Sequence, residues 1–138
     1  MSVDLVVAPC SHEAAKFAVM NWHYSKAMPA GKTFKLGVWA KRIYCGCIIY
    51  SLGSGRMTDG RKYGLAKSHE VAELSRVALS DHDFFSSQAI SKSLKLVKQA
   101  NPGIRLVISF ADYGEESHIG TLYQACNFVF AGRWDFPN

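Results

Sequence analysis

The chain has 138 residues, a formal net charge of +5, 49% hydrophobic residues and 20% charged residues. This length fits one compact domain, residues 1–138, and the apolar content excludes a disordered chain. No apolar run approaches the roughly 20 residues that span a bilayer, and the N-terminus carries no basic leader. The sequence therefore predicts a cytoplasmic protein with no membrane partner.

Four cysteines, Cys10, Cys45, Cys47 and Cys126, show no paired CxxC spacing. This argues against a zinc ribbon or a disulfide scaffold and favours reduced, buried thiols. Because side chains alternate along a strand, Cys45 and Cys47 are expected to share one face of the sheet.

Positive charge is concentrated in one segment. Residues 21–68 hold nine Lys or Arg and one acidic residue, a net of +8, whereas the remainder holds seven basic and ten acidic residues, a net of −3. The segment is suited to an anion such as nucleic acid, with a solvated basic face as the alternative. The candidate DNA-binding side chains are Lys26, Lys32, Arg56, Arg61, Lys62 and Lys67.

The first third of the chain predicts a strand, a helix and a hairpin. Residues 4–9 are typical of a short buried strand, and Ser11 offers an N-cap to a helix that runs through residues 14–24. Phe17, Met20 and Tyr24 recur on this helix at spacings of three and four, which predicts its apolar stripe. Two strands at 34–41 and 44–52 follow, and the short Lys41-Arg42 link predicts an antiparallel pair.

The rest of the chain predicts a βαβ unit and a closing helix and strand. Residues 53–70 are a long Gly-rich and charged loop of the kind that carries function. Next come a strand at 71–79, a helix at 86–100 with Ile90, Leu94 and Val97 on its inner stripe, and an apolar strand at 104–111. A helix at 120–128 and a strand at 129–136 complete the order β-α-β-β-loop-β-α-β-α-β. The strands at 71–79 and 104–111 should be parallel neighbours.

This topology places candidate chemistry at one edge of the sheet. Arg76 and Asp112 should lie near the same carboxyl edge, where open α/β sheets bind ligands. A buried guanidinium needs a partner, and Asp112 or Glu73 is the expected one, either as part of a site or as a structural ion pair. Asp112 could instead accept a hydrogen bond in a turn.

Three further residues are candidates for proton transfer. His118 precedes the last helix and could be an N-cap residue or a proton carrier. His23 closes the first helix, where interaction with the helix dipole is the alternative role. Tyr123 lies within the last helix, where core packing is the alternative. The sequence contains no HExxH motif and no Ser-His-Asp order.

The order of elements resembles the GNAT acyltransferase fold, and three stretches resemble the Mom family of bacteriophage DNA-modification proteins, divergent members of that fold. They are NWHYSKAMPAGK (21–32), HEVAELSRVAL (69–79) and SFADYGEESHIGTLYQACNFVFAG (109–132), in the same order and at similar separations. The resemblance implies an α/β (α+β) fold, a single GNAT-like domain with a central mixed twisted sheet flanked by helices.

The resemblance also implies an activity. Mom proteins add a carbamoylmethyl-type group to N6 of adenine in double-stranded DNA, which protects phage DNA from host restriction endonucleases in the host cytoplasm. Residues associated with activity in that family fall here on His23, Tyr24, Arg76, Asp112 and Tyr123, and His118 is a further acid or base. The donor of the group is a small molecule whose identity the sequence leaves open, as it leaves open whether the protein is a homodimer.

One departure bears on the cofactor. A GNAT enzyme has a glycine loop that cradles the CoA pyrophosphate, whereas this chain has LSDHDFFSSQA at 79–89, without glycine and with two aspartates. Acetyl-CoA is therefore disfavoured, and Ser86 and Ser87 are the candidate cofactor-binding residues. The family also raises iron, for which His23, His118 and Asp112 would be the ligands in a two-His, one-carboxylate set.

Two other functions remain in competition. A GNAT-type N-acetyltransferase acting on a small amine or protein would bind acetyl-CoA and need no DNA. A non-catalytic DNA-binding module would explain the basic segment but would give Asp112, Arg76 and His23 no task.

Overall fold

The computed structural model describes residues 4–52, 70–80, 84 and 86–109. Seven elements follow in chain order: β1 (Leu5–Pro9), α1 (His12–Trp22), β2 (Thr33–Ala40), β3 (Ile43–Leu52), β4 (Val71–Leu79), α2 (Ser86–Ala100) and β5 (Leu106–Ser109). The predicted order is confirmed through β5. The helix predicted at 120–128 and the strand predicted at 129–136 lie outside the described residues.

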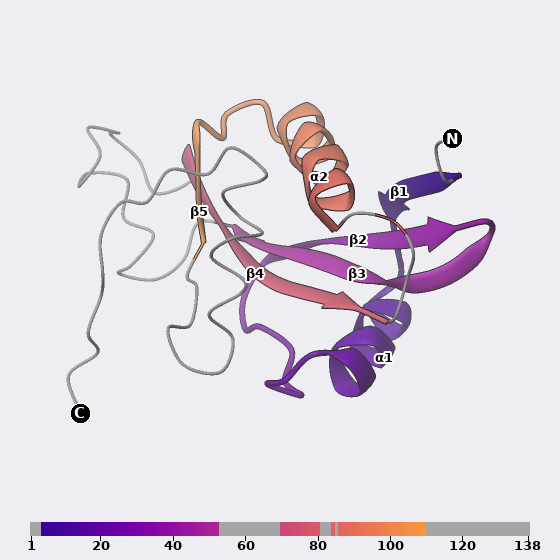
Figure 1. Cartoon of the computed structure of the whole chain (residues 1–138). Coiled ribbons are helices and arrows are strands. Elements are labelled where there is room, and N and C mark those ends of the chain that lie inside the picture. Colours follow the sequence, from indigo (N-terminus) through magenta and orange to yellow (C-terminus); the bar gives the residue numbers. More distant parts are fainter. Residues whose placement is uncertain (1–3, 53–69, 81–83, 85, 110–138) are drawn as a thin grey trace.

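The strands form one mixed, twisted sheet in the order β1-β2-β3-β4-β5 (Figure 1). The first four pair antiparallel, and β4 pairs parallel with β5, as the βαβ reading predicted. The β2–β3 hairpin turns at Lys41 and Arg42, which both have positive φ (51° and 68°). Two positive φ values in a two-residue link fit the right-handed twist of the strands that it joins.

Two helices cover opposite faces of this sheet (Figure 1). On one face α2 packs Ile90 and Val97 against Ile48, Tyr50 and Leu74. On the other face α1 packs Ala15, Ala18 and Val19 against Cys47, Ile49 and Ala78. Within the part of the chain that the structure describes, no helix is long and apolar enough to cross a membrane.

The predicted apolar stripe of α1 is wrong. Ser11 caps the helix as expected, its side chain accepting a hydrogen bond from the Ala14 N–H at 3.1 Å, and the helix ends at Trp22. Phe17, Met20 and Tyr24 are 54%, 44% and 63% exposed, because the helix approaches the sheet through its small side chains instead. Their large apolar side chains lie on the outer surface.

A bulge in β3 separates the two cysteines that were expected to share a face. Val38 of β2 pairs with Gly46, but Trp39 pairs with Tyr44, so Cys45 is an extra residue. Cys45 therefore packs on the α2 side and Cys47 on the α1 side. Burial raises the pKa of the Cys47 thiol to about 12, so it is a protonated, structural side chain.

A second bulge, in β4, changes the direction of the side chains beside Arg76. Ile49 pairs with Arg76 and Tyr50 pairs with Leu74, which leaves Ser75 as the extra residue. Leu74 and Val77 both pack on the α2 side, so the two residues between them lie toward the α1 side. Bulges of this kind often re-aim a side chain beside a functional site.

Candidate functional site

The candidate site lies on the α1 face of the sheet, where α1 ends and the bulge of β4 begins. His23 is the C-cap of α1: its N–H still donates to the Val19 carbonyl (3.2 Å), but its backbone is already extended. Its side chain is buried, 9% exposed, and its ring stacks on Tyr24 with centroids 4.5 Å apart. The end of the helix thus holds the imidazole in one place.

Arg76 connects β4 to the turn that follows His23. Its Nε donates to the Ala27 carbonyl at 2.9 Å and its Nη1 to the Ser75 carbonyl at 2.8 Å. Two bonds from one planar guanidinium fix its orientation. Among the described residues no ion pair joins Arg76 to Glu73, so the carboxylate partner expected from the sequence is replaced there by backbone carbonyls. Asp112, the other expected partner, lies outside the described residues.

Polar side chains continue along the same face. The Ser51 hydroxyl donates to the Ser75 hydroxyl at 2.9 Å, and the latter donates to the Ile49 carbonyl at 3.1 Å. Glu73 is the cross-strand partner of Ser51 and lies on this face as well. Burial raises the pKa of its carboxyl, and the charge of Arg76 acts against this rise. The face therefore combines a cation, a carboxyl group and two hydroxyls.

The electrostatics keep His23 neutral. Burial, as the largest cause, together with the positive charges of Arg76 and Lys26, lowers the pKa of its imidazole to about 4. An imidazole with this pKa carries no charge at neutral pH.

This shift has a consequence for stability. In the folded state the pKa of His23 is about 4, below the ordinary 6.5, so the unfolded chain binds the extra proton between these two pH values. The contribution of His23 to the free energy of unfolding should be complete above pH 6.5 and lost as the pH falls through 4, by up to roughly 3 kcal/mol.

Urea unfolding of the wild-type chain and of His23→Gln from pH 7 to pH 4 measures this contribution. The variant is the needed reference, since the raised pKa of Glu73 acts in the opposite sense at acid pH. The free energy of unfolding should fall more steeply with acidification in the wild type. Parallel curves would contradict the buried, neutral imidazole.

The basic candidates are only partly described. Lys26 and Lys32 are both exposed, and Lys26 has a positive φ of 51° in the turn after His23. Tyr24, which stacks on the His23 ring, is 63% exposed. The remaining basic candidates, Arg56, Arg61, Lys62 and Lys67, lie outside the described residues, as do His118 and Tyr123.

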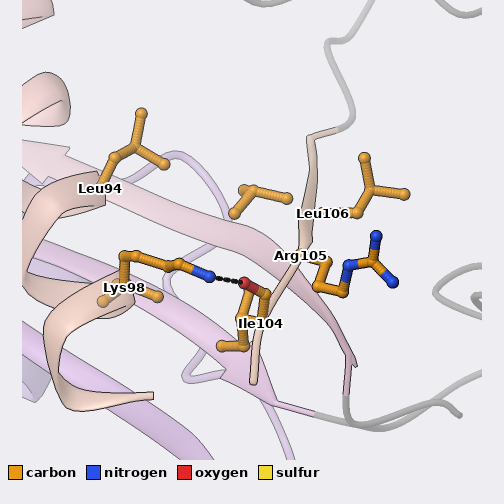
Figure 2. Close-up of a pocket in the computed structure, with 7 residues that line it drawn as sticks. Leu94, Lys98, Ile104, Arg105 and Leu106 are labelled. Carbon is orange, nitrogen blue, oxygen red and sulfur yellow. Dashed lines mark hydrogen bonds between the residues drawn. The ribbon is translucent and has the colours of Figure 1, made fainter. Parts of the chain in front are cut away.

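The candidate cofactor residues lie elsewhere. Ser86 and Ser87 begin α2, which covers the face of the sheet opposite to His23 and Arg76. A hollow of about 200 Å³ also lies on the α2 side, between the end of α2 and β5. In it the Lys98 Nζ donates to the Ile104 carbonyl at 2.9 Å (Figure 2). The hollow is lined mainly by apolar side chains and does not include His23 or Arg76.

Of the three ligands that the resemblance implied for iron, His23 alone lies among the described residues. The described residues contain no group of three or more His, Cys, Asp or Glu side chains that could hold a metal ion. The His23 Nδ1 accepts a hydrogen bond from the Ser25 N–H at 3.1 Å, so its lone pair is not available to a metal. Because Nδ1 accepts, the proton of the neutral ring lies on Nε2. His118 and Asp112, the other two proposed ligands, lie outside the described residues.

Sequence reasoning missed Ser25, Ser51 and Ser75. The sequence of β4, VAELSRVAL, contains a weak signal for its bulge. The apolar residues on the α2 side are spaced by two from Ala72 to Leu74 but by three from Leu74 to Val77, which is one residue more than regular alternation allows. No comparable signal marks Ser25, because its contacts depend on how the chain turns after the helix.

The fold is that of the GNAT acyltransferases. The structure is similar to the crystal structure of a ribosomal-protein-alanine N-acetyltransferase from Brucella melitensis biovar Abortus 2308, with a TM-score of 0.58 and 14% identity over 100% of this chain and 98% of that one. At this identity the likeness concerns the fold alone.

Sequence comparison gives the family. The model of the Mom protein family matches residues 4–135. The chain is 33% identical over 141 residues to the methylcarbamoylase Mom of Escherichia phage Mu, an alignment that covers 95% of this chain and 55% of that protein. The chain belongs to the Mom protein family, and it spans about half the length of this relative.

Proposed function

We propose that this chain is a phage DNA-modifying transferase that converts adenine in double-stranded DNA to an N6-carbamoylmethyl-type adenine. The observation that carries the proposal is the meeting of His23 and Arg76, 53 residues apart in sequence, through the turn at Ala27, in a chain of the Mom family. The name of the phage Mu relative, a methylcarbamoylase, supports the type of group.

The DNA side of the proposal rests on the basic segment 21–68. Its exposed Lys26 and Lys32 would contact phosphates beside the site, together with the basic side chains of residues 53–69. An enzyme that acts on N6 inside a duplex has to extrude the base, at a cost of a few kcal/mol. Tyr24 is exposed and already stacked on His23, so its ring offers a surface on which the extruded base can stack.

The proposed reaction is the transfer of a carbamoylmethyl group from an electrophilic donor. The bond from adenine N6 to the methylene carbon forms as the bond from that carbon to the leaving group breaks. One N6 proton passes to the Asp112 carboxylate. Arg76 orients Asp112 or the donor, while His118 and Tyr123 serve as further proton-handling groups. The modified adenine would block host restriction endonucleases in the host cytoplasm.

Asp112→Asn tests the catalytic part of this proposal. The variant should abolish adenine modification and leave DNA binding largely intact, since it removes the proton acceptor but none of the basic side chains. Modified deoxyadenosine in plasmid DNA measures the first, and a binding titration with duplex DNA at fixed salt measures the second. Equal loss of both would mean that Asp112 is structural.

The fold itself favours one competitor, an N-acetyltransferase. That function predicts saturable binding of acetyl-CoA and acetyl transfer in the absence of DNA. Calorimetric titration with acetyl-CoA separates the two proposals, and we expect no saturable binding because the segment before α2 lacks the glycine loop.

A further inference from the structure

The turn after α1 determines which nitrogen of His23 carries the proton. Its Nδ1 lies 3.1 Å from the Ser25 backbone nitrogen and 2.7 Å from the Ser25 Oγ. A backbone N–H can only donate, so Nδ1 must accept and cannot be protonated. The Ser25 hydroxyl then donates to the same nitrogen. The neutral imidazole is therefore the Nε2–H tautomer.

Ser25 also connects His23 to the anchor of Arg76. Its Oγ accepts the Ala27 N–H at 3.3 Å, and the Ala27 carbonyl accepts the Arg76 Nε at 2.9 Å. The hydroxyl has one hydrogen to share between Nδ1 at 2.7 Å and the Ala27 carbonyl at 3.4 Å, and the shorter contact is the stronger bond. One exposed serine thus links the two functional side chains.

The surroundings hold this arrangement in place. Tyr24 stacks on the ring at an interplanar angle of 27°, and the His23 side chain is 9% exposed, so the imidazole has little room to turn over. The positive charges that face His23 among the described residues, Arg76 and Lys26, disfavour a second proton on the ring.

We propose that Ser25 is a positioning residue that keeps His23 as the Nε2–H tautomer, so that His23 acts as a hydrogen-bond donor to an acceptor atom of the substrate and not as a base. The donor role rests on the proposed function, whereas the tautomer rests on the contacts of the turn alone. A carbonyl oxygen of the transferred carbamoyl group is the chemical class of acceptor that such a donor suits.

Nitrogen NMR of the intact protein, labelled with ¹⁵N at its five histidines, tests the tautomer directly. The His23 signals are assigned by their absence from His23→Gln. At neutral pH we expect Nδ1 to resonate as an unprotonated nitrogen and Nε2 as a protonated one. In Ser25→Ala the backbone N–H still donates, so Nδ1 should stay unprotonated, but the loss of the hydroxyl bond should shift its resonance. A protonated Nδ1 in the wild type would overturn the proposal.

Modification of plasmid DNA in cells tests the donor role. At matched protein levels, His23→Gln should retain clearly more modified deoxyadenosine than His23→Ala, because the glutamine amide can donate from nearly the same place as Nε2–H. Ser25→Ala should lower the rate about tenfold, the effect of losing one well-placed hydrogen bond, and Ser25→Thr should restore it. A half-buried serine of α2, changed in Ser91→Ala, is the matched control.

The two experiments fail separately. If His23→Gln is as inactive as His23→Ala while the NMR shows both folded, His23 is a base and the donor role is wrong. If the wild-type chain leaves plasmid DNA unmodified, the proposed function is wrong, and the NMR result still decides the tautomer.

Discussion

Arg76→Ala should reduce adenine modification by about 100-fold or more, the scale expected when reacting groups lose their alignment. The change removes the bond to the Ala27 carbonyl, which holds the turn after His23 against β4, and the bond to the Ser75 carbonyl, which orients the guanidinium within β4. It also removes a positive charge that lowers the pKa of His23, so that pKa should rise from about 4 toward 6.5 without reaching it, because burial is the larger cause.

Arg76→Lys separates the two effects of Arg76. Lysine keeps the charge, so the pKa of His23 should stay low, but a single ammonium group cannot reproduce the planar contact with two carbonyls. We therefore expect modification to remain strongly reduced. An NMR titration of His23 gives the pKa, and nucleoside analysis of plasmid DNA gives the modification. If Arg76→Ala modified adenine at the wild-type level, Arg76 would not be part of the functional site.

Gly46→Ala should destabilise the fold severely, by roughly 4 kcal/mol or more, the range reserved for strain and clashes that the structure cannot relieve. Gly46 has a φ of 143°, and a Cβ built there would lie 1.9 Å from the Ala78 carbonyl oxygen and 2.9 Å from the Leu79 Cα. Both neighbours are backbone atoms of β4, so relief would require breaking the pairing of Gly46 with Leu79.

Gly103→Ala is the matched control for this prediction. A Cβ at Gly103 meets no atom within 4 Å, so alanine should leave the free energy of unfolding within about 1 kcal/mol of the wild type, with a gain as the expected direction. Urea unfolding of the three chains measures the difference. Similar stabilities for Gly46→Ala and Gly103→Ala would contradict the close approach of β3 to β4.

The elements could be predicted from the sequence where local signals were strong. The apolar inner stripe of α2 and the apolar run of β5 allowed the parallel β4–β5 pair to be predicted, and the structure confirms it. The inner face of α1 could not be predicted this way, because apolar size does not report how closely a helix approaches a sheet. Ala15 and Ala18 permit the close approach, and Phe17 is left outside.

The face of the sheet on which each strand residue lies could not be predicted either. Alternation placed Cys45 and Cys47 on one face, but one extra residue in β3 reverses the facing of every position beyond it. The same event in β4 brings Ser75 and Arg76 to the α1 side. His23 and Arg76 were predicted as site residues, yet their connection through Ser25 and Ala27 is a tertiary contact that neither sequence segment contains alone.

The most direct test of the proposed activity is mass spectrometry of nucleosides digested from plasmid DNA after expression of this chain in bacteria, beside Asp112→Asn. The account predicts a heavier deoxyadenosine, with the added mass of a carbamoylmethyl group, that is present with the wild type and absent with the variant. Unmodified deoxyadenosine from cells that contain abundant, folded wild-type protein would contradict it.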